Sequence, residues 1–279
     1  MSFSLESKLK LRDGVEIPLL GFGTYELEYD DATNPVRWAL EAGYRHIDSA
    51  AWYYNEKQCG AAIRAFLAKS GLPRESIFFT TKLRHNSTYQ SVKSAIDKSV
   101  ADCGLGYIDL YLLHSPIGGP EARRESWRAV CDAKEEGKLR SIGVSNFGVA
   151  HINEMVRSGV ELPAINQVDL HPFMTRTEIV EICRKHDIAL EAWAPLVRGL
   201  RFRHPNVVEL AKKYSKSSAQ VLLRYSLQKG YIPIPKSGSQ KRIRANTEIF
   251  DFALTEEEVQ VLDGLNEDLV TDWEVTTSK

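Results

Sequence analysis

Cysteine is scarce in this sequence of 279 residues, and the four cysteines stand far apart. They are Cys59, Cys103, Cys131 and Cys183, and no C-x-x-C pair occurs. Disulfide frameworks and structural zinc sites need grouped or regularly spaced cysteines. The pattern therefore predicts reduced thiols, no metal site and a protein of the cytoplasm.

A long apolar run is absent as well. The N-terminal segment MSFSLESKLK has no hydrophobic core of the kind that a signal peptide carries. No other stretch approaches the roughly 20 apolar residues that span a bilayer. The sequence therefore predicts no membrane partner.

Neither sign of charge dominates, because 36 lysines and arginines balance 37 aspartates and glutamates to a net charge of −1. Proteins that bind nucleic acids usually carry a clear basic surplus, so we expect no nucleic-acid partner. The sequence also lacks a sustained apolar surface stripe. This favours a monomer and leaves a dimer as the alternative.

No linker rich in proline or serine divides the chain, so residues 1–279 are predicted to form one domain. Short apolar runs alternate instead with longer amphipathic segments. Strands are expected at residues 19–24, 46–50, 77–83, 108–114, 141–146, 165–170, 188–195 and 231–236. Helices are expected at residues 31–42, 55–69, 90–102, 122–136, 149–158 and 175–186.

Two further elements flank this pattern. The segment KLKLRDGVEIPLL predicts a β-hairpin that turns at Asp13-Gly14, and residues 256–265 predict a helix capped by Thr255. Eight strand–helix alternations favour a (β/α)8 TIM barrel with an N-terminal β-hairpin and an extra C-terminal helix. A doubly wound sheet is the alternative. Its G-x-G-x-x-G fingerprint is missing, because GFG at 21–23 lacks the third glycine.

Reactive side chains of such a barrel gather where its strands end. Asp48 and Tyr53 follow the second expected strand, Lys82 ends the third and His114 ends the fourth. Successive strand ends are about one strand–helix unit apart. The four groups are therefore expected to converge.

These residue types together suit the reduction of a carbonyl group. A tyrosine can give the oxygen a proton, and a nearby ammonium is expected to lower the tyrosine pKa from its ordinary value of about 10. A carboxylate would hold the ammonium, and a histidine would orient the carbonyl oxygen. Each residue alone is more simply a helix cap, a packing ring, a surface charge or a turn residue. Their coincidence at successive strand ends favours a functional role.

Seven segments also carry a resemblance to a known family. They are GFGTY (21–25), GYRHIDSAAWYYNE (43–56), FFTTKL (78–83), DLYLLHSP (109–116), GKLRSIGVSNF (137–147), INQVDLHP (165–172) and IPIPKSGSQKRIRAN (233–246). In order and spacing they resemble the aldo-keto reductases over nearly the whole chain. The resemblance implies that NADPH reduces small-molecule aldehydes or ketones to alcohols by transfer of its 4-pro-R hydride. It also implies a catalytic tetrad of Asp48, Tyr53, Lys82 and His114, with Tyr53 as proton donor.

Later strand ends offer side chains that suit a nicotinamide. Ser145, Asn146 and Gln167 can hydrogen-bond a carboxamide, and Trp193 can stack on the ring. Relatives often carry tyrosine at the position of Trp193. Packing at the top of the barrel and helix capping are the simpler readings of Trp193 and Asn146.

A basic loop after the last expected strand suits a phosphate group. In the family, Lys236, Ser237 and Arg242 match positions that contact the 2′-phosphate of NADPH, and Asn246 matches an adenine contact. Gly23 and Thr24 match backbone that lines the cofactor. The resemblance therefore implies NADPH (NADP+) as cofactor, with use of NADH left open.

The substrate pocket is expected to include Tyr25, Trp52, Arg84 and His85, which lie near strand ends. Arg84 stands where many relatives have an aromatic residue, so it either favours a polar or anionic substrate or points into solvent. The segment after His114 and the C-terminal tail are short. We therefore expect an open pocket with broad substrate use.

Two other functions compete with this one. A related barrel can bind NADPH without turnover, as a sensor or scaffold. A barrel glycosidase needs two carboxylates across a cleft. Besides Asp48, the carboxylates available are Asp169 and Glu191, which lie within strands and are expected to face helices.

Overall fold

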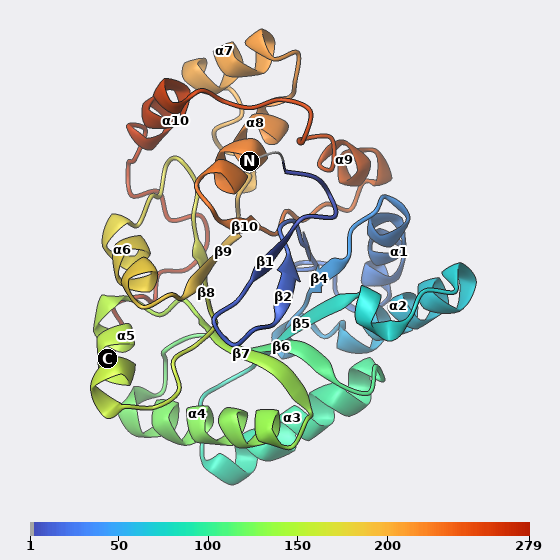
Figure 1. Cartoon of the computed structure of the whole chain (residues 1–279), viewed down its shortest axis with the longest axis vertical. Coiled ribbons are helices and arrows are strands. Elements are labelled where there is room, and N and C mark those ends of the chain that lie inside the picture. Colours follow the sequence, from blue (N-terminus) through green and yellow to red (C-terminus); the bar gives the residue numbers. More distant parts are fainter. Residues whose placement is uncertain (1–2) are drawn as a thin grey trace.

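The fold is a barrel of eight parallel strands with helices around it, seen in a computed structural model that describes residues 3–279 (Figure 1). The strands neighbour one another in chain order. They are β3 (Phe22–Gly23), β4 (His46–Asp48), β5 (Phe78–Leu83), β6 (Ile108–Leu113), β7 (Leu139–Ser145), β8 (Ile165–Asp169), β9 (Ala189–Trp193) and β10 (Ile232–Pro233). The predicted barrel is confirmed.

Backbone hydrogen bonds close the sheet between its first and last strands. The amide of Gly21 donates to the carbonyl of Pro233 at 3.0 Å, and that of Gly23 donates to Pro235 at 3.1 Å. Glycine is needed at this seam, because a Cβ on Gly23 would lie 2.8 Å from the carbonyl oxygen of Ile234. Strands β3 and β10 are shorter than expected. The prolines at the seam have no N–H to extend the ladder.

Helices connect the strands and cover the outside of the barrel (Figure 1). They are α1 (Thr33–Glu41), α2 (Glu56–Ser70), α3 (Tyr89–Cys103), α4 (Gly119–Glu135), α5 (Val149–Ser158), α6 (Thr177–Lys185), α7 (Pro205–Lys213), α8 (Ser218–Gln228), α9 (Gln240–Ala245) and α10 (Glu256–Asp263). The expected C-terminal helix is α10, and Thr255 caps it as predicted. Strands β5 and β6 are buried along their whole length, as strands covered on both faces must be.

The predicted N-terminal hairpin is present and covers one end of the barrel. It comprises β1 (Lys8–Lys10) and β2 (Glu16–Pro18), which pair antiparallel. Ile17 packs in a cluster with Phe78 and Ile232, which lie near the starts of barrel strands. The hairpin therefore leaves the opposite end, where the strands finish, for the candidate site.

The C-terminal tail returns to that opposite end. The amide of Leu269 donates to the carbonyl of Phe173 at 2.9 Å, and the hydroxyl of Thr271 donates to Asp169 at 3.0 Å. None of the helices within residues 3–279 is long and apolar enough to cross a membrane. In the same part of the chain, no group of three or more histidine, cysteine or acidic side chains is arranged to hold a metal.

Candidate functional site

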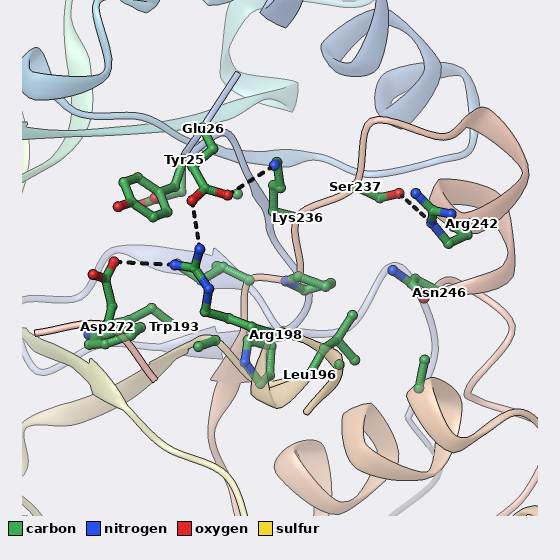
Figure 2. A pocket seen from close by; sticks show the side chains of 18 of the residues that line it. Tyr25, Glu26, Trp193, Leu196, Arg198, Lys236, Ser237, Arg242, Asn246 and Asp272 are labelled. Carbon is green, nitrogen blue, oxygen red and sulfur yellow. Dashed lines mark hydrogen bonds and ion pairs between the residues drawn. The ribbon is translucent and has the colours of Figure 1, made fainter. Parts of the chain in front are cut away.

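A cavity of about 980 Å³ opens at the carboxyl ends of the strands. Its lining includes Asp48, Tyr53 and His114 as well as Lys236 and Arg242. Figure 2 shows Lys236 and Arg242 among the side chains that line it. The cavity thus has two chemically different parts, a reactive end and a cationic end. It brings the predicted catalytic residues and the predicted phosphate residues into one space.

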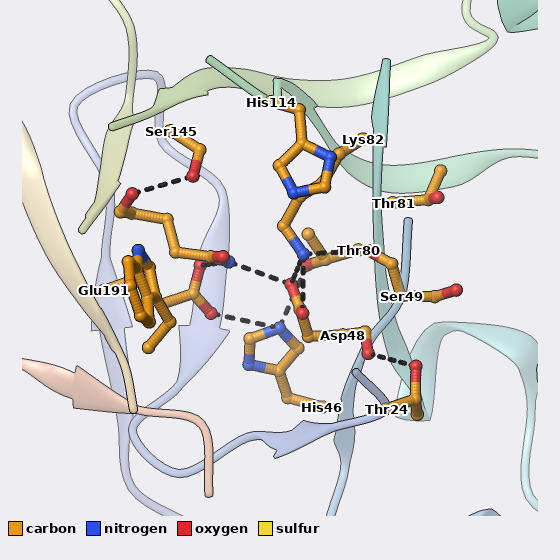
Figure 3. A network of polar contacts seen from close by, with 12 residues as sticks. Thr24, His46, Asp48, Ser49, Thr80, Thr81, Lys82, His114, Ser145 and Glu191 are labelled. Carbon is orange, nitrogen blue, oxygen red and sulfur yellow. Dashed lines mark hydrogen bonds and ion pairs between the residues drawn. The ribbon is translucent and has the colours of Figure 1, made fainter. Parts of the chain in front are cut away.

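Asp48 and Lys82 form a buried ion pair beneath the reactive end (Figure 3). The Lys82 ammonium donates to both Asp48 carboxylate oxygens, at 2.6 and 2.8 Å, and to the carbonyl of Ser49 at 2.9 Å. All three of its hydrogens are thereby used. Lys82 is fully buried, so neither charge gains from bulk water and each depends on the other.

Tyr53 lies above this pair. A 3-10 turn, η2 (Ala51–Tyr53), follows β4 and carries the ring to 5.0 Å from the Lys82 ammonium. Burial first, and then the negative charge of Asp48, raise the pKa of Tyr53 well above its usual range. This differs from the sequence-based expectation that Lys82 lowers that pKa. With its pKa raised in this way, the phenol keeps its proton at neutral pH.

His114 completes the reactive end with a neutral ring. Burial, aided by the positive charge of Lys82, lowers the pKa of His114 well below its usual range. Its ring packs edge-on against Trp52 and Trp273, with centroid distances of 5.4 and 6.2 Å. A neutral imidazole has one donor and one acceptor nitrogen. It can therefore orient a carbonyl oxygen without adding charge.

The residues expected to hold a nicotinamide cluster on the next strand ends. Asn146 accepts a hydrogen bond from the indole of Trp193 at 2.9 Å and donates to the carbonyl of His114 at 3.0 Å. The Ser145 hydroxyl donates to the backbone carbonyl of Gln167 at 2.8 Å. All four line the cavity. The site thus offers a flat aromatic ring beside amide and hydroxyl groups.

Gln167 joins the ion pair to a second acid. Its side-chain nitrogen donates to Asp48 at 2.9 Å and to Glu191 at 2.9 Å. Glu191 therefore points into the barrel, and the expectation that it faces a helix is wrong. Glu191 is fully buried and does not line the cavity, so it cannot act as the second carboxylate of a glycosidase.

Glu191 also faces His46, whose Nε2 lies 3.5 Å from its carboxyl oxygen (Figure 3). Burial, and then the negative charge of Asp48, raise the pKa of Glu191 to about 8. Burial and the charge of Lys82 lower the pKa of His46 to about 3. The contact is therefore between two neutral groups at neutral pH and is not an ion pair.

A neutral Glu191 makes stability depend on pH. An unfolded glutamate loses its proton near pH 4.5, whereas Glu191 keeps it until about pH 8 in the fold. Between these values the folded chain binds the extra proton, so the free energy of unfolding falls as pH rises, by up to about 1.4 kcal/mol per unit. We expect Glu191→Gln to remove this contribution. Urea unfolding of both proteins from about pH 5 to 8 checks it, and parallel profiles would contradict it.

At the other end of the cavity lies the basic loop. Ser237 accepts hydrogen bonds from Arg242 at 3.3 Å and from the amide of Ser239 at 3.1 Å. Lys236, Lys241 and Arg242 line the cavity here, beside the buried Asn246. Three cations around a hydroxyl suit an anion such as a phosphate. Sequence analysis did not single out Lys241.

An ion-pair network crosses the cavity between these two ends (Figure 2). Glu26 contacts Arg198 at 2.6 Å and Lys236 at 3.5 Å, and Arg198 reaches Asp272 at 3.4 Å. These residues come from the end of β3, the turn η4 (Val197–Gly199), the basic loop and the tail. The network was not expected from the sequence, because its members are far apart along the chain.

The predicted substrate residues divide into two pairs. Tyr25 and Trp52 line the cavity, whereas Arg84 and His85 do not. The Arg84 guanidinium lies over the Tyr54 ring at 5.4 Å, and His85 packs on the outer side of Trp52 at 4.9 Å.

Two residues of the short tail reach the cavity. They are Asp272 and Trp273. Of the residues expected to line the cofactor, Gly23 lines the cavity. Thr24 is buried behind it, where its hydroxyl donates to the carbonyl of Asp48 at 2.8 Å.

The chain matches one protein family over most of its length. The family model described as "Aldo/keto reductase family" matches residues 19–267. An uncharacterized oxidoreductase of Schizosaccharomyces pombe is 47% identical over 270 residues, covering 96% of this chain and 97% of the relative. A glyoxal reductase of Bacillus subtilis is 40% identical, covering 96% of each chain.

Solved structures agree with the sequence matches. The crystal structure of a Bombyx mori aldo-keto reductase in complex with NADP superposes with a TM-score of 0.89 at 39% identity. The match covers 95% of this chain and 94% of that one. The likeness therefore extends over the barrel and its connecting loops.

Proposed function

Because this chain belongs to the aldo/keto reductase family, an oxidoreductase family, we propose that it reduces aldehydes or ketones to alcohols with NADPH. The observation that carries the proposal is the shared cavity. It joins a phenol above a buried ammonium–carboxylate pair to a cluster of three cations. The cavity thus offers hydrogen-bonding groups for a carbonyl oxygen and cations for the phosphate of a cofactor.

Each residue of the reactive end then has one task. Tyr53 gives its proton to the carbonyl oxygen, and neutral His114 orients that oxygen by a hydrogen bond. The Lys82 ammonium, 5.0 Å from the ring, attracts the negative charge that develops on Tyr53 only as its proton leaves, and Asp48 holds that ammonium in place. Bound NADPH supplies the hydride. Tyr25, Trp52 and Trp273 line the same cavity and would give the substrate apolar surface.

The chemistry of the cavity lining suits an extended dinucleotide. Ser145, Asn146, Gln167 and Trp193 would hold the nicotinamide end. Lys236, Ser237 and Arg242 would hold the 2′-phosphate, and Asn246 the adenine, with Gly23 beside the chain between them. Lys241 adds a third cation at the phosphate end. Such a cluster favours a cofactor with an additional phosphate, which distinguishes NADPH from NADH.

Removal of these cations tests the choice of cofactor. We expect Lys236→Ala or Arg242→Ala to weaken NADPH about tenfold or more, as loss of a charged hydrogen bond does. The affinity for NADH, which lacks the 2′-phosphate, should change little. Calorimetric titration with both cofactors makes the comparison. Equal losses for the two would contradict the assignment of the 2′-phosphate to this loop.

The function itself is tested by NADPH oxidation with purified protein and a panel of aldehydes, ketones and sugar-derived carbonyls. We expect multiple turnovers with several of them. NADPH binding without turnover on any carbonyl would favour the sensor or scaffold alternative, and no NADPH binding would contradict the proposal.

The same proposal takes residues 1–279 as one domain that acts as a monomer in the cytoplasm on a small-molecule carbonyl. All four cysteines are free, which agrees with a reducing compartment. Light scattering after size-exclusion chromatography tests the monomer, and a mass near twice 31.5 kDa would favour the dimer.

A further inference from the structure

The side chain of Gln167 has two ends that face different surroundings. Its nitrogen lies between two carboxyl groups, 2.9 Å from an oxygen of Asp48 and 2.9 Å from one of Glu191. Gln167 lines the cavity, and no donor within residues 3–279 reaches its Oε1. The amide therefore has both hydrogens bonded on the inner side and its acceptor free.

The position of Glu191 follows from the sheet. Gln167 and Glu191 are paired residues of the neighbouring strands β8 and β9. Trp193 lies two residues after Glu191, so the pleat turns both toward the barrel interior, with Trp193 at the cavity and Glu191 one layer below. Glu191 is fully buried, and no chemical step of the proposed reaction uses it.

We propose that Glu191 is a positioning residue that, with Asp48, fixes the Gln167 amide so that its oxygen faces the cavity. A turn of the amide by half a rotation would bring its carbonyl oxygen against two carboxyl groups and leave both N–H groups without these acceptors. Buried groups without partners are costly. The proton of Glu191 offers a turned amide one hydrogen bond, but Asp48 offers none and both N–H groups lose their acceptors, so the two acids together favour the observed orientation.

The consequence for the cofactor rests on the proposed function. A fixed Oε1 would accept a hydrogen bond from the carboxamide N–H of a bound nicotinamide, whereas a turned amide would present a donor there. Asp48 alone can satisfy only one of the two N–H groups. Glu191 supplies the second acceptor and so removes the residual freedom of the amide.

Two substitutions of similar size separate this role from packing. Glu191→Gln keeps an acceptor oxygen for the Gln167 amide, whereas Glu191→Met fills similar volume without one. We expect E191Q to bind NADPH as the wild type does, and E191M to bind it about fivefold or more weakly. Thermal unfolding of both variants shows that they are folded at the temperature of the titration, so that a loss of affinity is not a loss of the fold. Equal affinities for E191Q and E191M would overturn the proposal.

A double-mutant cycle shows whether Glu191 acts through Gln167. Calorimetric Kd values for NADPH are compared among the wild type, E191M, Q167M and the double variant. If Glu191 works by holding the amide, E191M has no further effect once Gln167 is replaced. The same fold-loss in both backgrounds would overturn the proposal.

The cofactor-free protein gives a readout that does not depend on the proposed function. The side-chain amide signals of Gln167, identified by their absence in Q167M, should be protected from hydrogen exchange in the wild type and in E191Q. They should lose protection in E191M. Unchanged protection in E191M would overturn the inference even if NADPH binds, whereas failure of the wild type to bind NADPH would overturn only the proposed function.

Discussion

A Tyr53→Phe variant is expected to lose kcat by a factor of about 10²–10⁴, the usual contribution of a positioned proton donor. The substitution removes one hydroxyl and keeps the ring, which packs against Tyr25 at 5.2 Å and His114 at 5.7 Å. NADPH affinity should stay within about twofold, since no charge-assisted hydrogen bond to the cofactor is lost. Steady-state NADPH oxidation and calorimetric titration measure the two quantities.

The pH dependence should identify the same residue. Because burial and the charge of Asp48 raise the pKa of Tyr53, the phenol stays protonated throughout the neutral range. The rate of carbonyl reduction should therefore not fall between about pH 6 and pH 8 through loss of the Tyr53 proton. A decline with a midpoint near neutrality, absent in the variant, would contradict this protonation state.

Tyr111→Phe is the matched control. Tyr111 is fully buried on β6, and within the described residues its hydroxyl has no hydrogen-bond partner. The same change there should leave kcat within about twofold, as expected where no transition-state contact is removed. If Tyr53→Phe retained more than a tenth of the wild-type rate, another group would be the proton donor. If it lost NADPH binding together with turnover, the effect would lie in the cofactor site.

The order of strands and helices was predictable because each strand is short, apolar and covered on both faces. Strand-end residues such as Asp48, Lys82 and His114 were found for the same reason, since the end of an apolar run marks the rim of the barrel. The short lengths of β3 and β10 were not predictable. The ladders at β3 and β10 depend on which N–H groups meet across the seam, and local sequence does not contain that information.

The inward direction of the Glu191 side chain could have been predicted from the sequence. Trp193 was expected at the cavity, and alternate residues of a strand share a face, so Glu191 had to point inward as well. The same spacing places His46 and Asp48 on one face of β4, and Thr80 and Lys82 on one face of β5, where they meet (Figure 3). The direction of a charged side chain within a buried strand can therefore be inferred from the alternate residues of the same strand.

No sequence pattern predicts the ion-pair network of Glu26, Arg198 and Asp272. Their contacts join residues more than 70 positions apart, from three loops whose paths are set by tertiary packing. Trp273 likewise reaches the cavity only because the tail is held at Phe173 and Asp169. The pocket roof could not be predicted, because its residues are placed by long-range contacts and not by a repeating pattern.

Replacement of Lys82 by methionine is expected to lower the free energy of unfolding by about 3–5 kcal/mol near pH 8, the cost of leaving a buried charge unpaired. Asp48 keeps only its bond from Gln167, and burial already raises its pKa. Without Lys82 that pKa rises further. The folded chain then retains a proton that the unfolded chain has released, so stability falls as pH increases. The loss should therefore be smaller near pH 5, and urea unfolding at the two pH values measures it.

The double variant Asp48→Asn/Lys82→Met separates charge from packing. It leaves no ion in the barrel at this position, and a pair removed together is often nearly neutral in stability. We therefore expect it to recover most of the lost free energy and its pH dependence, while NADPH oxidation remains abolished in both variants. If the single variant lost equal stability at both pH values, or the double variant recovered none, the loss would come from the contacts around the lysine side chain. Recovery of stability without recovery of turnover would mean that the fold does not need the buried ion pair. The Lys82 ammonium near Tyr53 would then be retained for the reaction.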